Sequence, residues 1–320
     1  MPLISVIIPI YNAANYLDQA IRSVLGQSFG DFELICVNDG STDRSGEVLN
    51  KWVSHDQRIR LISQSNTGIV GALNAGLTVA RCELIARMDA DDICLPMRFE
   101  KQVVYMNSHQ DCVAVGSTAV LIDQDASPIK RWEVPAEHET ISRLHLEGMA
   151  GQIIHPSVLM RKSAIVAAGG YRPEWQWIED YDLFLRLAEL GKLANLQEDL
   201  LLYRLNICGV TRSRRKQQEH LTTKLCNQIR QQKGLPAISR DKIEAMAESK
   251  PDDVLAEWIE WAWRAGNYRT AQKHAKSLIC LRKFEIRSWR LFLKAYLGLL
   301  STPIVLSKRR FLKRFNFQLL

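Results

Sequence analysis

The chain has 320 residues, of which 47% are hydrophobic, and a formal net charge of +7. This length and composition can bury a full core, and they predict one large domain with a smaller appendage. No apolar run reaches the ~20 uncharged residues of a spanning helix, and no basic segment precedes the first apolar stretch, so we expect a cytoplasmic protein. Seven scattered cysteines without C-x-x-C spacing favour a reducing compartment over a disulfide frame or a zinc site.

Charge is unevenly distributed along the chain. Residues 205–320 carry 24 Lys and Arg against 9 Asp and Glu, whereas residues 1–204 carry 18 against 26. A basic half favours anionic partners such as membrane phosphates or nucleic acid. The acidic first half, and the lack of a recognised nucleic-acid-reading motif, argue against nucleic acid.

Strand and helix patterns alternate from residue 3 to residue 92. Short apolar runs at 3–9, 32–37, 59–62 and 84–88 predict buried strands. The spacing or composition of residues 15–26 and 68–80 predicts helices, and the polar turn at 38–43 is expected to cap another helix at Asp43. This alternation predicts a parallel sheet with helices on its faces.

Polar residues follow the predicted strands at the point where each one ends. Ligands of such sheets bind beyond the carboxyl ends of the strands. The segments that fall there are Pro9–Asn12, Asn38–Asp39, Ser65–Gly68 and Asp89–Asp91.

The stretch from 86 to 92, A-R-M-D-A-D-D, places three carboxylates within four positions. In an extended D-x-D segment, side chains two residues apart point to the same side, so Asp89 and Asp91 are able to face one ion. Mg²⁺ and Mn²⁺ accept carboxylate oxygens and leave other positions to phosphate and water. The alternative is a solvated acidic turn without an ion.

An ordered series of motifs resembles the family 2 glycosyltransferases, an inverting family with the GT-A fold. The series comprises V-I-I-P-I-Y-N at 6–12, V-N-D-G-S-T-D at 37–43, N-T-G-I-V-G-A-L-N-A-G at 66–76, M-D-A-D-D at 88–92, H-P-S-V-L-M-R at 155–161, G-G-Y at 169–171 and I-E-D-Y-D-L-F-L-R-L at 178–187. It covers about the first 205 residues. The expected fold is therefore α/β, a Rossmann-like mixed, mainly parallel sheet with helices on both faces, plus a small helical C-terminal region.

The resemblance implies a nucleotide site at the strand ends. Tyr11 would stack on the base, with Pro9 fixing the loop, and Asp39 would accept from the base or ribose; its alternative is to cap the helix from residue 43 onward. Other residues implied on the nucleotide side are Asn12, Asn66, Gly68, Asn74 and Asp89. Asp91, with Asp89, would hold Mn²⁺ or Mg²⁺ against the diphosphate. Asp92 would either assist them or cap the following turn, and we favour the cap.

The acceptor side is implied by residues 175–187. Asp180 lies near the start of a predicted helix ending at Gly191, where the helix dipole would hold its carboxylate ionised. The resemblance makes Asp180 the general base. One of Trp175 and Trp177 is expected to face the sugar, and the other to lie in the core. For His155, a structural role competes with a catalytic one.

The sequence departs from the family pattern at 203–206, Y-R-L-N, where members often carry a histidine after Tyr-Arg. The basic stretch from Thr211 to Lys216 is a candidate loop over a phosphate, or a solvated segment.

We place the domain boundary after Gly234-Leu235-Pro236, which gives a catalytic domain at 1–235 and a helical, basic region at 236–320. Residues 257–271 resemble one helix-turn-helix unit of the tetratricopeptide kind.

The segment 281–320 is basic and rich in aromatic residues, with ten Lys and Arg against Glu285 alone. This composition favours peripheral attachment to the anionic inner face of the cytoplasmic membrane, although a helix docked on the protein is the alternative.

The function expected is transfer of a sugar from a nucleotide-diphospho-sugar, preferably a UDP-sugar, to a saccharide or lipid-linked acceptor in cell-surface polysaccharide or lipopolysaccharide assembly. The alternatives are a polyprenyl-phosphate sugar transferase and a non-catalytic sugar-nucleotide-binding protein.

Overall fold

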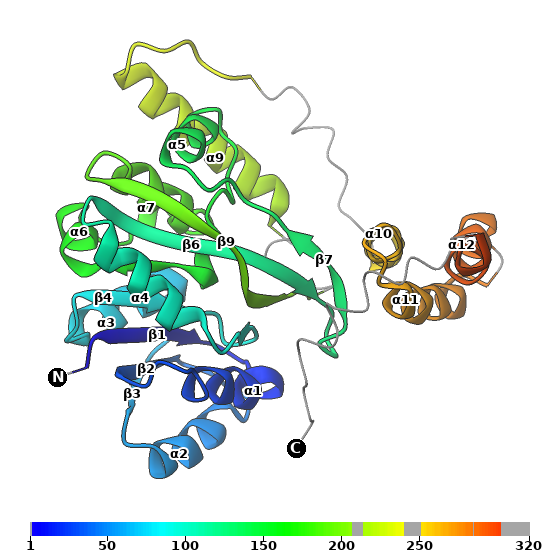
Figure 1. Cartoon of the computed structure of the whole chain (residues 1–320), viewed down its shortest axis with the longest axis horizontal. Coiled ribbons are helices and arrows are strands. Elements are labelled where there is room, and N and C mark those ends of the chain that lie inside the picture. Colours follow the sequence, from blue (N-terminus) through cyan, green and yellow to red (C-terminus); the bar gives the residue numbers. More distant parts are fainter. Residues whose placement is uncertain (1, 207–213, 240–250, 284, 302–320) are drawn as a thin grey trace. The chain divides into compact units, whose positions relative to one another are not determined.

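The computed structural model describes residues 2–206, 214–239, 251–283 and 285–301 (Figure 1). The chain divides into two compact units. The first consists of Met1–Ser127 and Arg131–Glu248, and the second of Pro128–Lys130 and Ser249–Leu320.

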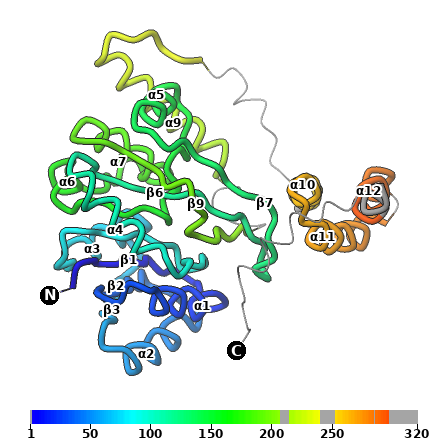
Figure 2. The backbone as a smooth tube through the Cα atoms, viewed as in Figure 1, coloured from blue at the N-terminus to red at the C-terminus, as the bar shows by residue number. Residues whose placement is uncertain are grey.

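The N-terminal half of the sheet is parallel. Its strands are β1 (Ile4–Ile10), β2 (Phe32–Asp39), β3 (Ile59–Gln64) and β4 (Leu84–Arg87), in the order β3-β2-β1-β4. All seven residues of β1 are buried, as expected for a strand covered on both faces. The parallel sheet predicted from the alternating pattern is thus confirmed, and its course can be followed in Figure 2.

The sheet continues beyond β4 with mixed directions. The further strands are β8 (Leu159–Arg161), β6 (Cys112–Ile122), β9 (Lys192–Arg204) and β5 (Ile93–Cys94), with β7 (Pro128–Trp132) paired to β6. β8 is antiparallel to both β4 and β6, whereas β6 and β9 are parallel. The predicted mixed, mainly parallel sheet is therefore confirmed.

Helices cover both faces of the sheet. One apolar cluster joins the strands to α1 (Ala14–Leu25), α2 (Ser45–His55) and α4 (Arg98–Ser108). The cluster on the opposite face joins them to α3 (Gly68–Val79), α5 (His138–Leu146), α6 (Lys162–Ala167) and α7 (Glu179–Leu187). The 3₁₀ turns η1 (His155–Ser157) and η2 (Pro173–Trp175), and the helix α9 (Arg215–Gln232), complete the described elements of this unit.

Two predicted positions agree with the structure, and one helix boundary was wrong. Pro9 lies inside β1, paired with Val37, as the predicted strand 3–9 required. The helix expected to be capped at Asp43 begins at Ser45, and the Asp43 carboxylate accepts the Ser45 N–H at 2.9 Å. The helix expected to end at Gly191 is shorter, because α7 ends at Leu187.

Among the described residues of the second unit are the helices α10 (Pro251–Arg264), α11 (Tyr268–Leu281) and α12 (Ile286–Ser301). The predicted helix-turn-helix is present, and Gly266 makes its turn with a φ of 79° that favours glycine. Trp258 and Ala262 on α10, and Ala271 and Ala275 on α11, are buried between the helices. No helix in the described part of the chain is long and apolar enough to cross a membrane.

Candidate functional site

Three carboxylates meet directly after β4. Asp89, Asp91 and Asp92 each offer an oxygen, and these oxygens lie within 4.8 Å of one another. Burial, and then the charge of Asp89, raise the pKa of Asp91 to about 6, and burial raises the pKa of Asp92 well above its ordinary value. Such a crowded set of oxygen donors fits a hard divalent cation.

Arg87, the last residue of β4, supplies the nearest positive charge. Its side chain is buried, and its two terminal nitrogens lie 2.8 and 2.7 Å from the two oxygens of Asp89. This bidentate pair fixes the orientation of Asp89. Sequence reasoning assigned no role to Arg87, although its position two residues before the D-x-D segment was visible.

Arg204, at the end of β9, holds the same loop from the other side. Its Nε donates to the Asp91 carbonyl at 2.7 Å, and its backbone N–H donates to the Asp92 carboxylate at 2.8 Å. Asp92 is buried, and its Oδ2 has no hydrogen-bond partner among the described residues. The expectation that Asp92 caps the following turn was therefore wrong, because its carboxylate is bound to the β9 backbone.

Asp39 ends β2 with its side chain buried. Its Oδ1 accepts the Thr67 N–H and its Oδ2 accepts the Gly68 N–H, both at 2.9 Å. Asp39 therefore caps α3, and the alternative that it caps the helix after residue 43 is wrong. This places an anionic group and the N-terminus of α3 beside the end of β1, where a nucleotide contact for Asp39 stays a prediction.

Other residues predicted on the nucleotide side surround this helix start. Tyr11 follows β1 with 53% of its surface exposed, whereas the Asn12 side chain accepts the Thr42 N–H at 2.8 Å and shapes the neighbouring loop. The Asn66 carboxamide oxygen accepts the Gly68 N–H at 3.2 Å. Gly68 has a φ of 79°, and a Cβ there would lie 2.8 Å from the amide nitrogen of Gln176. Gln176 thus brings the segment before α7 onto this loop.

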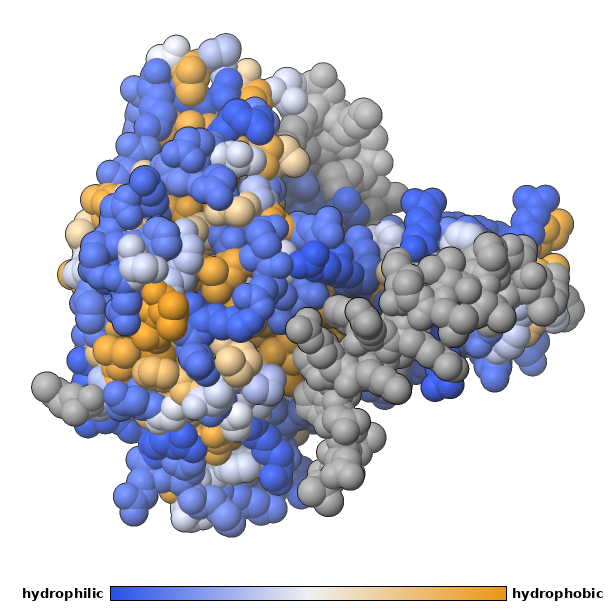
Figure 3. Space-filling view, viewed as in Figure 1, coloured by the Kyte–Doolittle hydropathy of each residue, from blue (hydrophilic) through white to orange (hydrophobic). Residues whose placement is uncertain are grey.

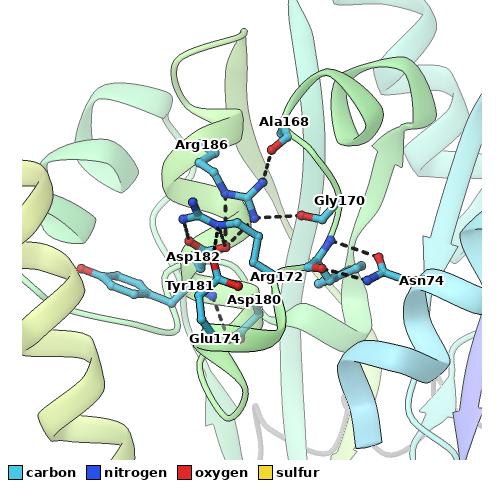
Figure 4. Close-up of polar contacts among 10 residues, drawn as sticks. Asn74, Ala168, Gly170, Arg172, Glu174, Asp180, Tyr181, Asp182 and Arg186 are labelled. Carbon is cyan, nitrogen blue, oxygen red and sulfur yellow. Dashed lines mark hydrogen bonds and ion pairs between the residues drawn. The ribbon is translucent and has the colours of Figure 1, made fainter. Parts of the chain in front are cut away.

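Asn74 lies one and a half turns into α3 and connects it to the G-G-Y loop. Its Nδ2 donates to the Tyr171 carbonyl at 2.8 Å, and its Oδ1 accepts the Tyr171 N–H at 3.1 Å (Figure 4). Both polar atoms of the Asn74 side chain are used in these two hydrogen bonds. The contact of Asn74 with a nucleotide stays a prediction.

The acidic pair Glu179 and Asp180 begins α7. Burial, followed by the charge of Asp180, raises the pKa of Glu179 to about 7, and its carboxylate accepts the Trp177 N–H at 2.9 Å. Burial also raises the pKa of Asp180, although the hydrogen bond from the Tyr181 N–H opposes this shift. Burial thus has a larger effect on the pKa of Asp180 than the amide at the helix start, and the expectation that its carboxylate is ionised stays a prediction.

Asp182 anchors the same helix turn. This carboxylate is fully buried and forms ion pairs with Arg172 and Arg186, which both point toward it in Figure 4. Arg186 also donates to the carbonyls of Ala168 and Gly170. The G-G-Y loop and α7 are thus joined by an ionic clamp that sequence reasoning missed.

The two tryptophans before α7 differ in burial. Trp175 is buried against Tyr181 and Leu185, so it is the core member of the pair, whereas Trp177 is half-buried and has the Arg214 guanidinium 4.7 Å from its ring centre. His155 is buried, and its Nε2 is hydrogen-bonded to the Tyr171 hydroxyl at 2.8 Å. These contacts favour the structural alternative for His155.

The carboxylates after β4 and those on α7 act on one another. The charge of Asp89 contributes to the raised pKa of Asp180, and Arg87 opposes the rise for both Glu179 and Asp180. Electrostatic effects of this kind require proximity. The sheet edge and the start of α7 therefore lie near one another, and the charge of Arg87 acts on acidic residues of both.

Comparison with known proteins gives consistent matches. A family model described as glycosyl transferase family 2 matches residues 5–165. The amylovoran biosynthesis glycosyltransferase AmsE of Erwinia amylovora is 34% identical over 63% of this chain and 76% of that protein. The O-antigen biosynthesis glycosyltransferase WbnJ of Escherichia coli is 34% identical over 64% of this chain and 81% of that protein.

Solved structures share the fold at low sequence identity. TarS 1-349 of S. aureus in complex with UDP-GlcNAc superposes with a TM-score of 0.54 at 15% identity, covering 93% of this chain and 80% of that one. The mannosyltransferase PcManGT of Pyrobaculum calidifontis, in complex with GDP-Man and Mn²⁺, superposes with a TM-score of 0.54 at 16% identity, covering 93% and 81%. These likenesses show the GT-A fold.

Proposed function

Because the chain belongs to glycosyl transferase family 2, we propose that it moves a sugar from a nucleotide-diphospho-sugar to an acceptor hydroxyl with inversion at the anomeric carbon. The observation that supports this proposal is the electrostatic proximity of the carboxylates after β4 and Asp180 on α7, since the charges of Asp89 and Arg87 both act on Asp180. One acidic group suits a cation and a diphosphate, and the other suits an acceptor hydroxyl.

On the donor side, we expect a nucleoside to bind near the N-terminus of α3, capped by Asp39, and the exposed ring of Tyr11. Asp89 and Asp91 would hold a Mg²⁺ or Mn²⁺ ion, which supplies Lewis-acid stabilisation of the leaving diphosphate when bound. A UDP-sugar is the preferred donor, in keeping with the UDP-GlcNAc complex of TarS, while the GDP-Man complex of PcManGT makes a GDP-sugar the alternative.

On the acceptor side, Asp180 acts as the general base. Its carboxylate takes the hydroxyl proton of the acceptor while that oxygen forms a bond to C1 of the sugar, and the bond from C1 to the diphosphate oxygen breaks. The raised pKa of Asp180 makes it a stronger base than an exposed carboxylate. The ionic clamp at Asp182 keeps the start of α7 in place during this transfer.

The biological role that we propose is assembly of a cell-surface polysaccharide or lipopolysaccharide, in keeping with the names of AmsE and WbnJ. The acceptor is then a saccharide or a lipid-linked saccharide, reached from the inner face of the cytoplasmic membrane. The basic stretch 211–216 and the tail 281–320 are the segments predicted to meet phosphate and membrane. Residues 211–213, 284 and 302–320 lie outside the described residues.

The proposal is tested first by titrating UDP into the protein with and without Mn²⁺, and then by following UDP release from UDP-sugars. Asp91→Ala is expected to abolish the Mn²⁺-dependent part of UDP binding. Asp180→Asn is expected to keep UDP binding and to lower kcat by a factor of about 10²–10⁴, the usual contribution of a general base. Wild-type protein that binds neither UDP, GDP nor dTDP would contradict the proposal.

Product analysis separates the enzymatic alternatives. A lipid phosphate that accepts sugar in place of a saccharide would indicate a polyprenyl-phosphate sugar transferase. Nucleotide binding without turnover on either acceptor, unchanged by Asp180→Asn, would indicate a non-catalytic sugar-nucleotide-binding protein.

A further inference from the structure

A groove of about 380 Å³ lies within the second unit, between α10 and α12. Basic side chains dominate its charge, and the ring of Trp261 forms part of its wall. The ionisable residues that line it are Arg264, Arg287, Arg290, Lys294, Glu257 and Glu260. Nothing in the transfer reaction proposed above uses this groove.

The acidic residues neutralise only part of this positive charge. Glu260 accepts Lys294 at 2.6 Å and lies 3.7 Å from Arg264, so one carboxylate is shared by two cations. Arg287 pairs with Asp253 at 3.3 Å. Arg290 is exposed and makes no hydrogen bond or ion pair within the part of the chain that the structure describes. An excess of positive charge in a concave surface favours an anionic ligand.

α12 also carries an exposed apolar stripe. Ile286, Trp289 and Leu293 expose 72%, 47% and 49% of their surface. The opposite side of the helix, which includes Ser288 and Ala295, is buried. Apolar residues are visible at the α12 side of this unit in Figure 3. The helix therefore has more apolar surface than the described residues of its unit cover.

The groove and the stripe adjoin one another along α12. Arg290 is four residues after Ile286 and three before Leu293, and side chains at these spacings are neighbours on a helix. A ligand that meets both features must combine an anionic group with an apolar body. A membrane lipid has this combination, whereas a free anion would leave the stripe exposed.

We propose that the α10–α12 groove and the stripe Ile286–Trp289–Leu293 form a docking surface for an anionic phospholipid bilayer, with a lipid phosphate in the groove. Arginine suits this role because its planar guanidinium donates two parallel hydrogen bonds to a phosphate. Trp289 suits the interface because its ring is amphipathic and its Nε1 already donates to the Lys283 carbonyl at 2.7 Å. The inference rests on the membrane attachment proposed above and names the residues that produce it.

The test is flotation of the full-length protein with two kinds of vesicle, phosphatidylcholine alone and an equimolar mixture with phosphatidylglycerol. Wild-type protein is expected to float with the anionic vesicles and to remain unbound with the neutral ones. The double variant Arg287→Gln/Arg290→Gln should lose affinity about twenty-five-fold, because each basic residue at an anionic surface contributes about fivefold.

A matched control variant has the same net charge as the double variant of the groove. Arg269→Gln/Lys276→Gln removes two exposed cations from α11, outside the groove, and should retain most of the wild-type affinity. Ile286→Ser tests the stripe and should also weaken flotation, whereas Val104→Ser, which replaces a similarly exposed residue on α4, should not. Circular dichroism of each variant verifies that the helices are intact.

The outcomes separate the inference from the proposals beneath it. Wild-type protein that fails to float with anionic vesicles contradicts membrane attachment, while UDP binding and turnover report independently on the transferase. If both double variants weaken flotation equally, net charge alone explains binding, and the groove is not the docking site. The wild-type protein could instead sediment as a dimer and fail to float with vesicles. If Leu293→Ser then dissociates that dimer, the stripe binds a second copy of the chain and the inference is overturned.

Discussion

Arg87 and Asp89 form a bidentate ion pair two residues apart, with nitrogen to oxygen distances of 2.7 and 2.8 Å. The charge of Arg87 also acts on Glu179 and Asp180 at the start of α7 and opposes the rise in their pKa values. Arg87 is buried and Asp89 is half-buried. One cation therefore offsets part of the repulsion among these acidic residues.

Arg87→Met should therefore destabilise the fold. The variant leaves Asp89, Glu179 and Asp180 without their shared cation, and loss of one partner from a buried ion pair costs about 3 kcal/mol. Urea unfolding measures this change in the free energy of unfolding. The double variant Arg87→Met/Asp89→Asn should recover part of the loss, since it removes the unpaired charge as well. Additive effects of the two substitutions would show that the pair is not coupled.

A second prediction concerns Arg204, which holds the loop of Asp91 and Asp92. Lysine has too few donors in a fixed plane to keep the bonds to the Asp91, Asp123 and Gln124 carbonyls. Arg204→Lys should weaken Mn²⁺-dependent UDP binding about tenfold, as expected for losing one charge-assisted hydrogen bond that positions the site. Isothermal titration calorimetry measures this affinity.

The control for this variant is Arg161→Lys. Arg161 also donates to backbone carbonyls, those of Cys112 and Met106, both at 2.9 Å. These contacts involve none of the site residues, so Arg161→Lys should lower stability and leave UDP affinity unchanged. Equal losses of UDP affinity in the two variants would attribute the effect to general destabilisation.

A third prediction concerns the turn before α3. Gly68 has a positive φ, and a Cβ there would meet the Gln176 side chain at 2.8 Å. Gly68→Ala should destabilise the protein by about 1–2 kcal/mol through backbone strain. The double variant Gly68→Ala/Gln176→Ala should recover only the part of the lost stability that is due to the contact with the Gln176 side chain. Thermal unfolding gives both values, and a fully restored Tm in the double variant would show that backbone strain is negligible.

The sequence predicted the parallel strands and the D-x-D segment because each depends on local periodicity and on residues close together in the chain. Asp180 was likewise predicted at the start of α7, although its role is still to be tested. The partners of these residues were missed where they come from distant segments. Arg204 is 113 residues from Asp91 in the chain, and no local pattern links them.

Burial was the second quantity that local patterns failed to give. The N-terminal position of Asp180 on α7 predicted that the helix start dominates its electrostatics, whereas burial has the larger effect and raises its pKa. Asp92 shows the same limit, since the sequence alone does not distinguish an Asp that caps a surface turn from an Asp that is buried. Both corrections required the packing of β9 and α7 around the sheet edge.

The final prediction is a pH dependence of stability that originates at His145 on α5. The imidazole is buried between the rings of Tyr181 and Phe184, and neither ring nitrogen has a hydrogen-bond partner among the described residues. Burial lowers the pKa of His145 from 6.5 to about 4. Between these values the unfolded chain binds a proton at this residue and the folded protein does not. The free energy of unfolding therefore decreases as the pH falls from 6.5 to 4.

The expected loss at His145 is about 3 kcal/mol over this interval, at ~1.4 kcal/mol per pH unit. Burial lowers the pKa of His155 as well, so the wild-type protein should show a steeper total dependence. His145→Leu should reduce the slope of unfolding free energy against pH by about one proton, measured by urea unfolding at several pH values. His220→Leu, which replaces an exposed histidine on α9, should leave the slope unchanged. A His145→Leu protein with the wild-type slope would mean that His145 is protonated in the folded state, and that a nearby acceptor stabilises its charge.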